Sequence, residues 1–298
     1  MKGLWFLILL LFFASASRAD VIYVPYNVGG WSDIVARVVA KYEKNSLVLN
    51  VNAGRSTQGF DTVYKRKQLI SMGMSFLITD PILYPKDPKY DFLKNFDIFV
   101  LGYSPNILFV NSTLNTDNLK DLKKSALEKE LLYSTSGSFN HIAILEFLSA
   151  LGINARQIPY NGGAQSTLAV LSNQVHLSMT NLTGLQSIIQ NKNIRILGVS
   201  SSHRIKGYPE IPTLQEQLNQ PFTALAYAMI AVPKSMDKKD LDYWHRFILN
   251  ISNDREFVND LEKIGLVFGL IHGKEFELWF QKQNNFYRKM VDKYNVKG

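Results

Sequence analysis

Two glycine-rich segments contain the residues whose types and spacing could bind a small molecule. PYNVGG occupies positions 25–30 and PYNGG occupies 159–163, and an amphipathic helical pattern follows each of them. Glycines let the backbone approach a ligand closely. A helix that begins there offers free N–H groups and the positive end of its dipole, which favour an anion. A tight turn without a ligand explains the first segment alone equally well, so the anion site is a hypothesis.

The start of the helix after the first segment bears on the kind of ligand. Ser32 is expected to be the N-cap of a helix that starts at Asp33–Ile34. The Asp33 carboxylate either caps this helix or favours a ligand that also carries an ammonium or hydroxyl group. The candidate binding residues of the two segments are Tyr26, Asn27, Gly29, Gly30, Ser32, Asp33, Tyr160, Asn161, Gly162 and Gly163.

A third segment, STSGSFNH at 134–141, lies between a predicted strand and a predicted helix. Many donors without fixed charge suit a carboxylate that is held by hydroxyl and backbone hydrogen bonds. Thr180 and Asn181 follow another predicted strand, whose carboxyl end would deliver polar side chains to a crevice, although an exposed loop is equally consistent. The candidates from the third segment are Ser134, Ser136, Gly137, Asn140 and His141.

Catalysis by the third segment is disfavoured. Ser136 and His141 could form a nucleophile and base, but no G-x-S-x-G motif occurs and no acidic residue is placed to orient the histidine. A histidine that packs at the start of a helix is the simpler interpretation. The other histidines are scattered, without H-x-x-x-H or H-E-x-x-H spacing. We therefore expect no catalytic residue, no metal site and no cofactor.

The elements that must position these residues alternate along the chain. Predicted strands lie at 21–24, 47–51, 69–74, 106–110, 131–134, 156–160, 176–179, 194–200 and 266–270. Predicted helices lie at 34–42, 141–152, 164–173, 237–251, 254–264 and 274–292, and Gly152 is expected to end the second of them. This alternation predicts an α/β architecture with mainly parallel sheets and helices on both faces.

Composition limits the class of protein. The chain has 298 residues and no cysteine, which excludes thiol catalysis, thiolate metal sites and disulfides. Lys2, the apolar stretch from Leu4 to Ala14 and the small residues around Arg18 predict a signal peptide, 1–19, cleaved after Ala19. Cleavage lowers the net charge from +8 to +6 because it removes two cations and no acid. The surplus favours anions, but without compact basic runs it does not indicate nucleic-acid binding.

The order of several motifs resembles the tripartite tricarboxylate transporter receptor family, also called Bug or TctC-like proteins. The motifs are PYNVGGWSDIVAR at 25–37, LYPKDPKYDFLKNF at 83–96, YSTSGSFNH at 133–141, IPYNGG at 158–163, QVHLSMTNL at 174–182, IRILGVSSSHR at 194–204 and YPEIPTLQE at 208–216. They extend over nearly all of the chain after residue 20.

The resemblance implies an α/β type II periplasmic binding protein fold, with two lobes joined by two crossing strands near 104–111 and 222–230. Domain 1 would contain residues 20–104 plus 230–298, and domain 2 would contain residues 105–229, with the ligand cleft between them. It also implies a periplasmic monomer that captures a small carboxylate and delivers it to the permease subunits of a membrane transporter. Ser75 joins the expected ligand contacts, as do Thr180 and Asn181.

Four departures from the family pattern modify this expectation. The segment from Gly73 to Pro81 is one residue shorter than usual, which leaves open whether Ser75 and Thr79 contact the ligand. The loop Asn52–Gly59 is shorter than usual and displaces Arg55, and Asp80 replaces a common asparagine. Thr180 stands where many relatives carry aspartate, which favours a plain carboxylate over an ammonium-bearing ligand. Two alternatives to transport stay open: a receptor of the same fold that senses a metabolite and signals to a membrane partner, and, more distantly, an exported serine hydrolase using Ser136.

Overall fold

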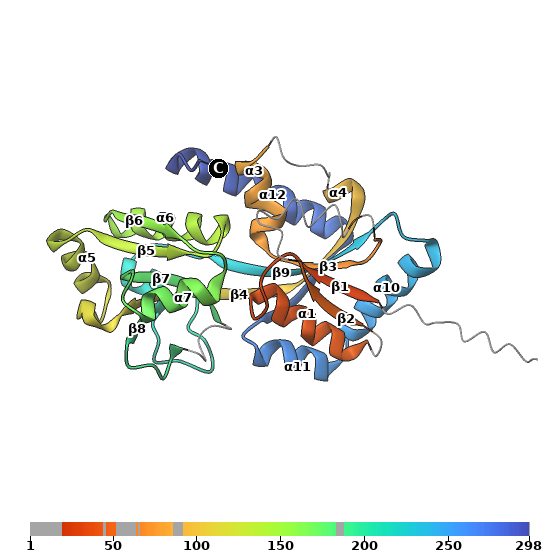
Figure 1. The fold of residues 1–298 in the computed structure, drawn as a ribbon, viewed down its shortest axis with the longest axis horizontal. Helices are drawn as coiled ribbons and strands as arrows, with labels where there is room; N and C mark the ends of the chain where they lie inside the picture. Colours follow the sequence, from red (N-terminus) through yellow and green to blue (C-terminus); the bar gives the residue numbers. More distant parts are fainter. Residues whose placement is uncertain are drawn as a thin grey trace, which may run out of the picture.

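The computed structural model describes residues 20–43, 46–51, 64, 66–85, 92–182 and 188–297. They form two α/β lobes that lie side by side and are joined by two long strands (Figure 1). The expected signal peptide and the loop Asn52–Gly59 lie outside the described residues. Within the described residues, no helix is long and apolar enough to cross a membrane.

Lobe 1 is built on three parallel strands in the order β2-β1-β3. β3 (Leu69–Met72) is buried along its length, as expected for a strand covered on both faces. β2 (Leu47–Asn50) is at the edge and alternates exposed and half-buried residues. The other elements of lobe 1 are β1 (Val21–Val24), α1 (Trp31–Tyr42), η1 (Ser75–Thr79), α3 (Asp80–Leu83), α4 (Phe92–Asn95), α10 (Lys238–Ile251), α11 (Arg255–Lys263), β10 (Val267–Ile271) and α12 (Gly273–Tyr294).

Lobe 2 is built on β5 (Leu131–Thr135), which lies between the parallel strands β6 (Ala155–Pro159) and β7 (Leu177–Asn181). Gly152 follows the longest helix of this lobe with φ 71°, in the left-handed region, and so confirms the predicted helix end. The other elements of lobe 2 are η2 (Ser112–Leu114), α5 (Leu119–Glu128), α6 (Ser138–Leu151), α7 (Gly163–Leu171), β8 (Ile194–Val199) and α9 (Leu214–Leu218).

The two crossing strands are β4 (Phe96–Asn111) and β9 (Leu225–Pro233), which pair antiparallel with each other. β4 also pairs with β10 in lobe 1 and with β7 and β8 in lobe 2, so it belongs to both lobes. Its register with β9 shifts between Val100 and Gly102. This continuous ladder positions the two lobes relative to each other. The loops that follow the carboxyl ends of β1, β5 and β6 then face the boundary between the lobes.

Three expectations from the sequence were wrong. The sheets are mixed, because β4 and β9 run antiparallel to their neighbours. The strand predicted at 106–110 is the second half of β4, which begins ten residues earlier. Ser32 is not the N-cap: α1 begins at Trp31 after Gly30, whose carbonyl accepts the first helical bond from Ile34 at 3.0 Å. Ser32 is a buried residue inside the first turn instead.

The apolar core is divided among both faces of the two sheets. In lobe 1, α1, α10 and α11 share one buried cluster with the strands. The opposite face carries a second cluster with η1 and α12, and this cluster also includes Phe139 and Ile142 of α6 in lobe 2. The other side of α6 contributes Ile144 and Phe147 to the core of lobe 2 itself. α6 is therefore buried on two sides, between the lobes.

Candidate functional site

The two glycine-rich junctions meet. The side-chain amide of Asn27 donates to the backbone carbonyl of Asn161 at 2.7 Å, across 134 positions of sequence. The contact arises because β1 and β6 both end at the boundary between the lobes, and each junction follows directly. Gly162, at φ 116°, faces the same amide, and a Cβ there would lie 3.8 Å from it. One loop from each lobe thus borders a common space.

Within the first junction, Asp33 holds the loop rather than facing outward. Its carboxylate is 1% exposed and accepts from the backbone N–H of Gly29 at 2.8 Å and from Nε and Nη2 of Arg37, each at 3.0 Å. Burial by itself would raise the pKa of Asp33, but the hydrogen bonds from Arg37 and Gly29 outweigh it and lower the pKa. The Asp33 carboxylate therefore ties the loop at Gly29 to the first turn of α1, whose N-cap, Gly30, has no side-chain hydrogen bond.

Tyr26 lies on the inner side of the first junction and packs against both apolar clusters of lobe 1. Burial raises the pKa of its hydroxyl, and the nearby Asp80 carboxylate raises it further. The hydroxyl is thus neutral over the physiological range and can act as a hydrogen-bond donor. Its backbone carbonyl accepts from the side chain of Asn50 at 3.1 Å, which fixes the loop on β2.

The second junction is open at the start of α7. Gly162 is the N-cap without a side-chain hydrogen bond, and no acidic residue occupies the first turn. A Cβ on Gly163 would meet no atom within 4 Å, so space adjoins this helix end. Ser166, inside the first turn, already donates its N–H to Gly162. The preceding N–H groups and the positive end of the dipole suit a small anion here.

The N-terminus of α6 is occupied by groups from lobe 1. The backbone N–H of Phe139 donates to Ser75 Oγ at 3.2 Å, and Ser138 Oγ donates to the Asp80 carboxylate and contacts Thr79 Oγ1. Ser75 also lies 3.0 Å from the Cβ position of Gly137, which has φ 155°. Ser75 therefore reaches the opposite lobe directly.

The polar residues of the loop before α6 are mostly satisfied within lobe 2. Asn140 accepts from the backbone N–H of Ser136 at 3.2 Å and donates to the carbonyl of Met179 at 2.9 Å. Ser134 is fully buried and exchanges hydrogen bonds with Ser166 on α7 at 2.8–2.9 Å. These contacts hold the loop to β7 and α7 and leave the Ser136 side chain half-buried at its surface.

His141 packs against Tyr133 rather than against Ser136. Its Nδ1 lies 3.2 Å from the tyrosine hydroxyl, and the two rings stack with centroids 6.0 Å apart. Burial lowers the pKa of His141 to about 4 and raises that of Tyr133 to about 12. In the described part of the chain, no hydrogen bond joins the side chains of Ser136 and His141, so the serine–base pair that a hydrolase needs is not assembled.

The remaining predicted residues lie at the boundary between the lobes. Thr180 and Asn181 are the half-buried last residues of β7 and pair with Ile107 and Asn106 of β4. The Tyr160 hydroxyl, by contrast, points along α7 to Gln174 at 3.5 Å. Among the described residues, no group of three or more histidine, cysteine, aspartate or glutamate side chains could hold a metal ion.

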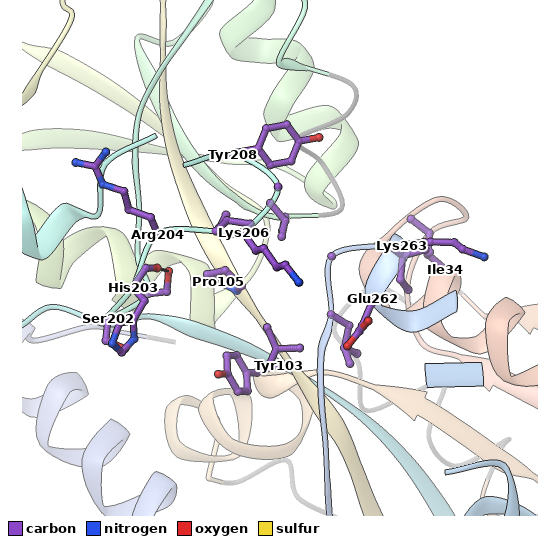
Figure 2. A pocket seen from close by; sticks show the side chains of 18 residues that line it. Ile34, Tyr103, Pro105, Ser202, His203, Arg204, Lys206, Tyr208, Glu262 and Lys263 are labelled. Atoms are coloured by element: carbon purple, nitrogen blue, oxygen red, sulfur yellow. Dashed lines mark hydrogen bonds between the residues drawn. The ribbon is translucent and has the colours of Figure 1, made fainter. Parts of the chain in front are cut away.

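A cavity of about 900 Å³ between the lobes was not predicted as part of the site. Its walls include Tyr103 and Pro105 of β4, residues 201–208 after β8, and residues 262–267, from the end of α11 to the start of β10. Figure 2 shows Lys206 and Glu262 extending into it from different lobes. Two further wall residues, Ile34 and Leu182, directly follow the predicted site residues Asp33 and Asn181 in the sequence. Some of its wall residues lie in the motifs at 194–204 and 208–216, which have no recognisable chemistry of their own.

Two α/β lobes on a pair of crossing strands, with glycine-rich loops facing each other between them, define a type II periplasmic binding protein, as the sequence predicted. The chain belongs to the tripartite tricarboxylate transporter family of receptors, whose family model matches residues 67–295. This family comprises periplasmic solute-binding receptors and is not a family of enzymes.

Individual relatives agree with this assignment. Protein BugT of Bordetella pertussis is 27% identical over 78% of this chain and 76% of its own length. Rpa4515 of R. palustris, solved with adipate, superimposes with a TM-score of 0.87 at 20% identity and covers 95% of this chain and 99% of its own. MatC of Rhodopseudomonas palustris, solved with malate, has a TM-score of 0.78 at 16% identity and covers 93% and 99%. Rpa4515 and MatC therefore share the fold of this chain.

Proposed function

We propose that this protein captures a small carboxylate between its two lobes and delivers it to the permease of a tripartite tricarboxylate-type transporter. The single observation that carries the proposal is the meeting of the two junctions, from different lobes, beside an α7 N-terminus that no acidic side chain caps. Such a site supplies directed N–H donors and a favourable dipole for a carboxylate. The surplus of positive charge along the chain would favour its approach.

The predicted site residues divide into those that we propose to contact the ligand and those that hold the loops in place. At the second junction, Gly163 and the residues after it in the first turn of α7 would bind the carboxylate through backbone donors, with Asn161, Gly162, Ser136 and Thr180 beside them. The Gly162 N–H itself already donates to the Tyr160 carbonyl at 3.0 Å. From lobe 1, Tyr26, Asn27 and Gly30 would close over the ligand. The other predicted residues would act mainly by holding these loops, because each already has a hydrogen bond or a strand pairing within the protein: Gly29, Ser32, Asp33, Ser75, Ser134, Gly137, Asn140, His141, Tyr160 and Asn181.

A dicarboxylate is the ligand class that we favour. The structural relatives named above were solved with adipate and with malate, which are both dicarboxylates. The internal use of Asp33 and the threonine at position 180 leave no free acid at the junctions to pair with an ammonium group. A sensing role, in which the liganded protein signals to a membrane partner, is the second candidate for the same site.

The proposal includes export and a division of the chain. Residues 1–19 would be removed after Ala19, and the mature protein would act as a periplasmic monomer. The lobe boundaries would fall at residues 104–105 and 229–230, both inside the crossing strands β4 and β9. Rotation about these strands would open and close the cleft. The strands are the parts of the chain that the two lobes share, which supports this location.

Calorimetric titration with a panel of mono-, di- and tricarboxylates tests the binding proposal. At least one acid should bind at one site per chain, and Gly163→Leu should weaken it at least about tenfold, because a side chain there fills the space beside α7. Gly269→Leu on β10 is the matched control: a Cβ there also meets no atom within 4 Å, but the residue is remote from both junctions.

Circular dichroism and thermal melting of both variants would verify that each is folded. Absence of binding by any acid to the folded wild-type protein would refute the proposal. Equal affinity in wild type and Gly163→Leu would show that the ligand does not use the start of α7. Transport and sensing are then separated by asking whether deleting the receptor abolishes uptake of the bound acid or only a transcriptional response to it.

A further inference from the structure

α12 presents lysines and two large apolar side chains to solvent along one side. Its inner side, which includes Phe276 and Tyr287, packs into the apolar cluster that α12 shares with β3, η1 and α6. Figure 1 shows the helix at the upper edge of the view, reaching from lobe 1 towards α6. On its outward side, exposed residues follow one another at intervals of three or four positions and so lie in one row. We call this row, which consists of Leu278, Lys282, Phe286 and Lys289, the α12 stripe.

The cations around this stripe lack the partners that other helical lysines have. Lys282, Arg288 and Lys289 take part in no ion pair with the described residues. By contrast, Lys238 on α10 lies 3.4 Å from the Asp242 carboxylate one turn away. The helix dipole does not explain these cations either, because it favours them only in the last turn and they lie before it. Within the described part of the chain their charge is therefore uncompensated.

Acidic residues are scarce along the same part of α12. Both glutamates of the helix lie within its first five residues, and from Leu278 to the end of the helix the only acid in the sequence is Asp292. The last cation, Lys293, lies 4.7 Å from the centre of the Tyr294 ring and near Glu146 of α6, so it is not counted in the stripe. The remaining cations give the middle of the helix a local positive potential.

The two apolar side chains of the stripe alternate with its lysines. Leu278 is 69% exposed and Phe286 is 39% exposed. Side chains of these types on a basic helix suit the boundary between lipid headgroups and acyl chains, because the apolar groups enter it while the lysine stems reach back to anionic headgroups. A protein partner matches less well, because lysine is depleted at protein interfaces and a single convex helix offers little contact area.

From this arrangement we propose that the α12 stripe is a docking surface for a membrane that contains anionic phospholipids. The proposal rests on the proposed function only for its purpose, which is to keep the receptor close to a membrane permease. Docking is weak and reversible, since two lysines and two apolar side chains supply far less than a lipid anchor combined with a basic cluster. None of the predicted ligand contacts lies on α12, so docking and ligand binding use separate surfaces.

Co-sedimentation with lipid vesicles tests the proposal. The chain is used from Asp20 onwards, because the apolar stretch before it would itself bind lipid. This protein should sediment with phosphatidylcholine vesicles that contain about 30% phosphatidylglycerol, and not with pure phosphatidylcholine vesicles. Binding should weaken as salt is added, since the charges are exposed. No carboxylic acid is present, so the result does not depend on whether the receptor binds a ligand.

A double substitution with a matched control locates the surface. Lys282→Ala with Lys289→Ala should weaken vesicle binding at least about tenfold, because each basic residue near an anionic membrane contributes about fivefold. Lys120→Ala with Lys123→Ala removes the same charge from α5, where acidic residues are interspersed with the lysines. It should change binding less than about twofold. Circular dichroism and thermal melting would verify that both variants are folded.

A fluorescent label reports which part of the protein meets the lipid. The chain has no cysteine, so Asn285→Cys, at an exposed position beside the stripe, and Leu127→Cys on α5 can each carry one polarity-sensitive dye. Anionic vesicles should shift the emission of the dye at residue 285 to shorter wavelength and leave that of the dye at residue 127 unchanged.

Three results would overturn the proposal. The first is no binding of the wild-type protein to anionic vesicles; if polyglutamate then changes the emission of the dye at residue 285, the stripe fits an acidic protein instead. The second is an equal loss of binding in the two double-lysine variants, because it would show attraction by the net charge of the whole molecule. The third is an equal emission change at both labelled positions.

Discussion

At the scale of single residues, the predicted site divides into groups that face the space between the lobes and groups already used to build its walls. Sequence spacing placed Asp33 and Ser134 near the site but could not say where their polar atoms point. Asp33 is bound by Arg37, four residues further along α1, and Ser134 by Ser166 on the next helix. Such partners depend on helix phase and on which helix covers which strand.

His141 gives a prediction at this scale. Its pKa is lowered to about 4 from an ordinary value of 6.5, because burial disfavours the charged ring. A folded-state pKa below the unfolded value means that the unfolded chain binds the proton more tightly. The stability that this histidine contributes is therefore complete above pH 6.5 and decreases as the pH falls towards 4.

The measurement is urea unfolding of wild type and His141→Asn at about pH 7 and about pH 4.5. Between these two pH values, the free energy of unfolding should fall by on the order of 2 kcal/mol more in wild type than in the variant. His203→Asn, which changes an exposed histidine, should follow wild type. A pH dependence that is the same with and without His141 would show that the ring is not enclosed against Tyr133.

At the scale of elements, most helices and the short strands were predictable because their apolar spacing is regular. The predicted helices at 141–152 and 164–173 differ from α6 and α7 by at most three residues at either end. β4 was only half recognised, since Pro105 interrupts its pattern and its two halves serve different lobes. The antiparallel direction of β4 and β9 is a property of the topology that local periodicity does not contain.

Gly102 lies at the register shift of β4, and the need for a glycine at this point of the strand can be tested. Its φ is 147°, and a Cβ would lie 2.2 Å from the carbonyl oxygen of Val267 on β10. Gly102→Ala should lower the free energy of unfolding by about 3 kcal/mol or more, because the two strands would have to separate. Denaturant unfolding measures this change directly.

Gly269→Ala on the same neighbouring strand is the control, since no atom lies within 4 Å of its Cβ position. Its effect should stay below about 1 kcal/mol. Equal effects of the two alanine substitutions would mean that the close approach of β4 and β10 does not constrain the crossing strand. The comparison separates the effect of replacing a glycine from the effect of a steric clash at its Cβ position.

At the scale of the whole molecule, the sequence predicted two lobes, because the echo of the PYN and glycine-pair motif and the family order both pointed to them. It did not predict how the lobes touch. Both the Asn27–Asn161 contact and the contact between the Phe139 ring of α6 and the Tyr287 ring of α12 join residues more than 130 positions apart. The cavity that contains Lys206 and Glu262 is likewise formed by loops with no shared motif. Long-range contacts of this kind require the folded chain.

The central claim is that one small carboxylate is held by both junctions at once. Amide NMR of the isotope-labelled protein during titration with the tightest-binding acid tests it most directly. The account predicts that the largest shift changes fall on residues 161–165 and 27–30 and that both groups saturate at the same acid concentration. Changes confined to one lobe, or centred on residues 201–208 and 262–267 around the cavity, would contradict it.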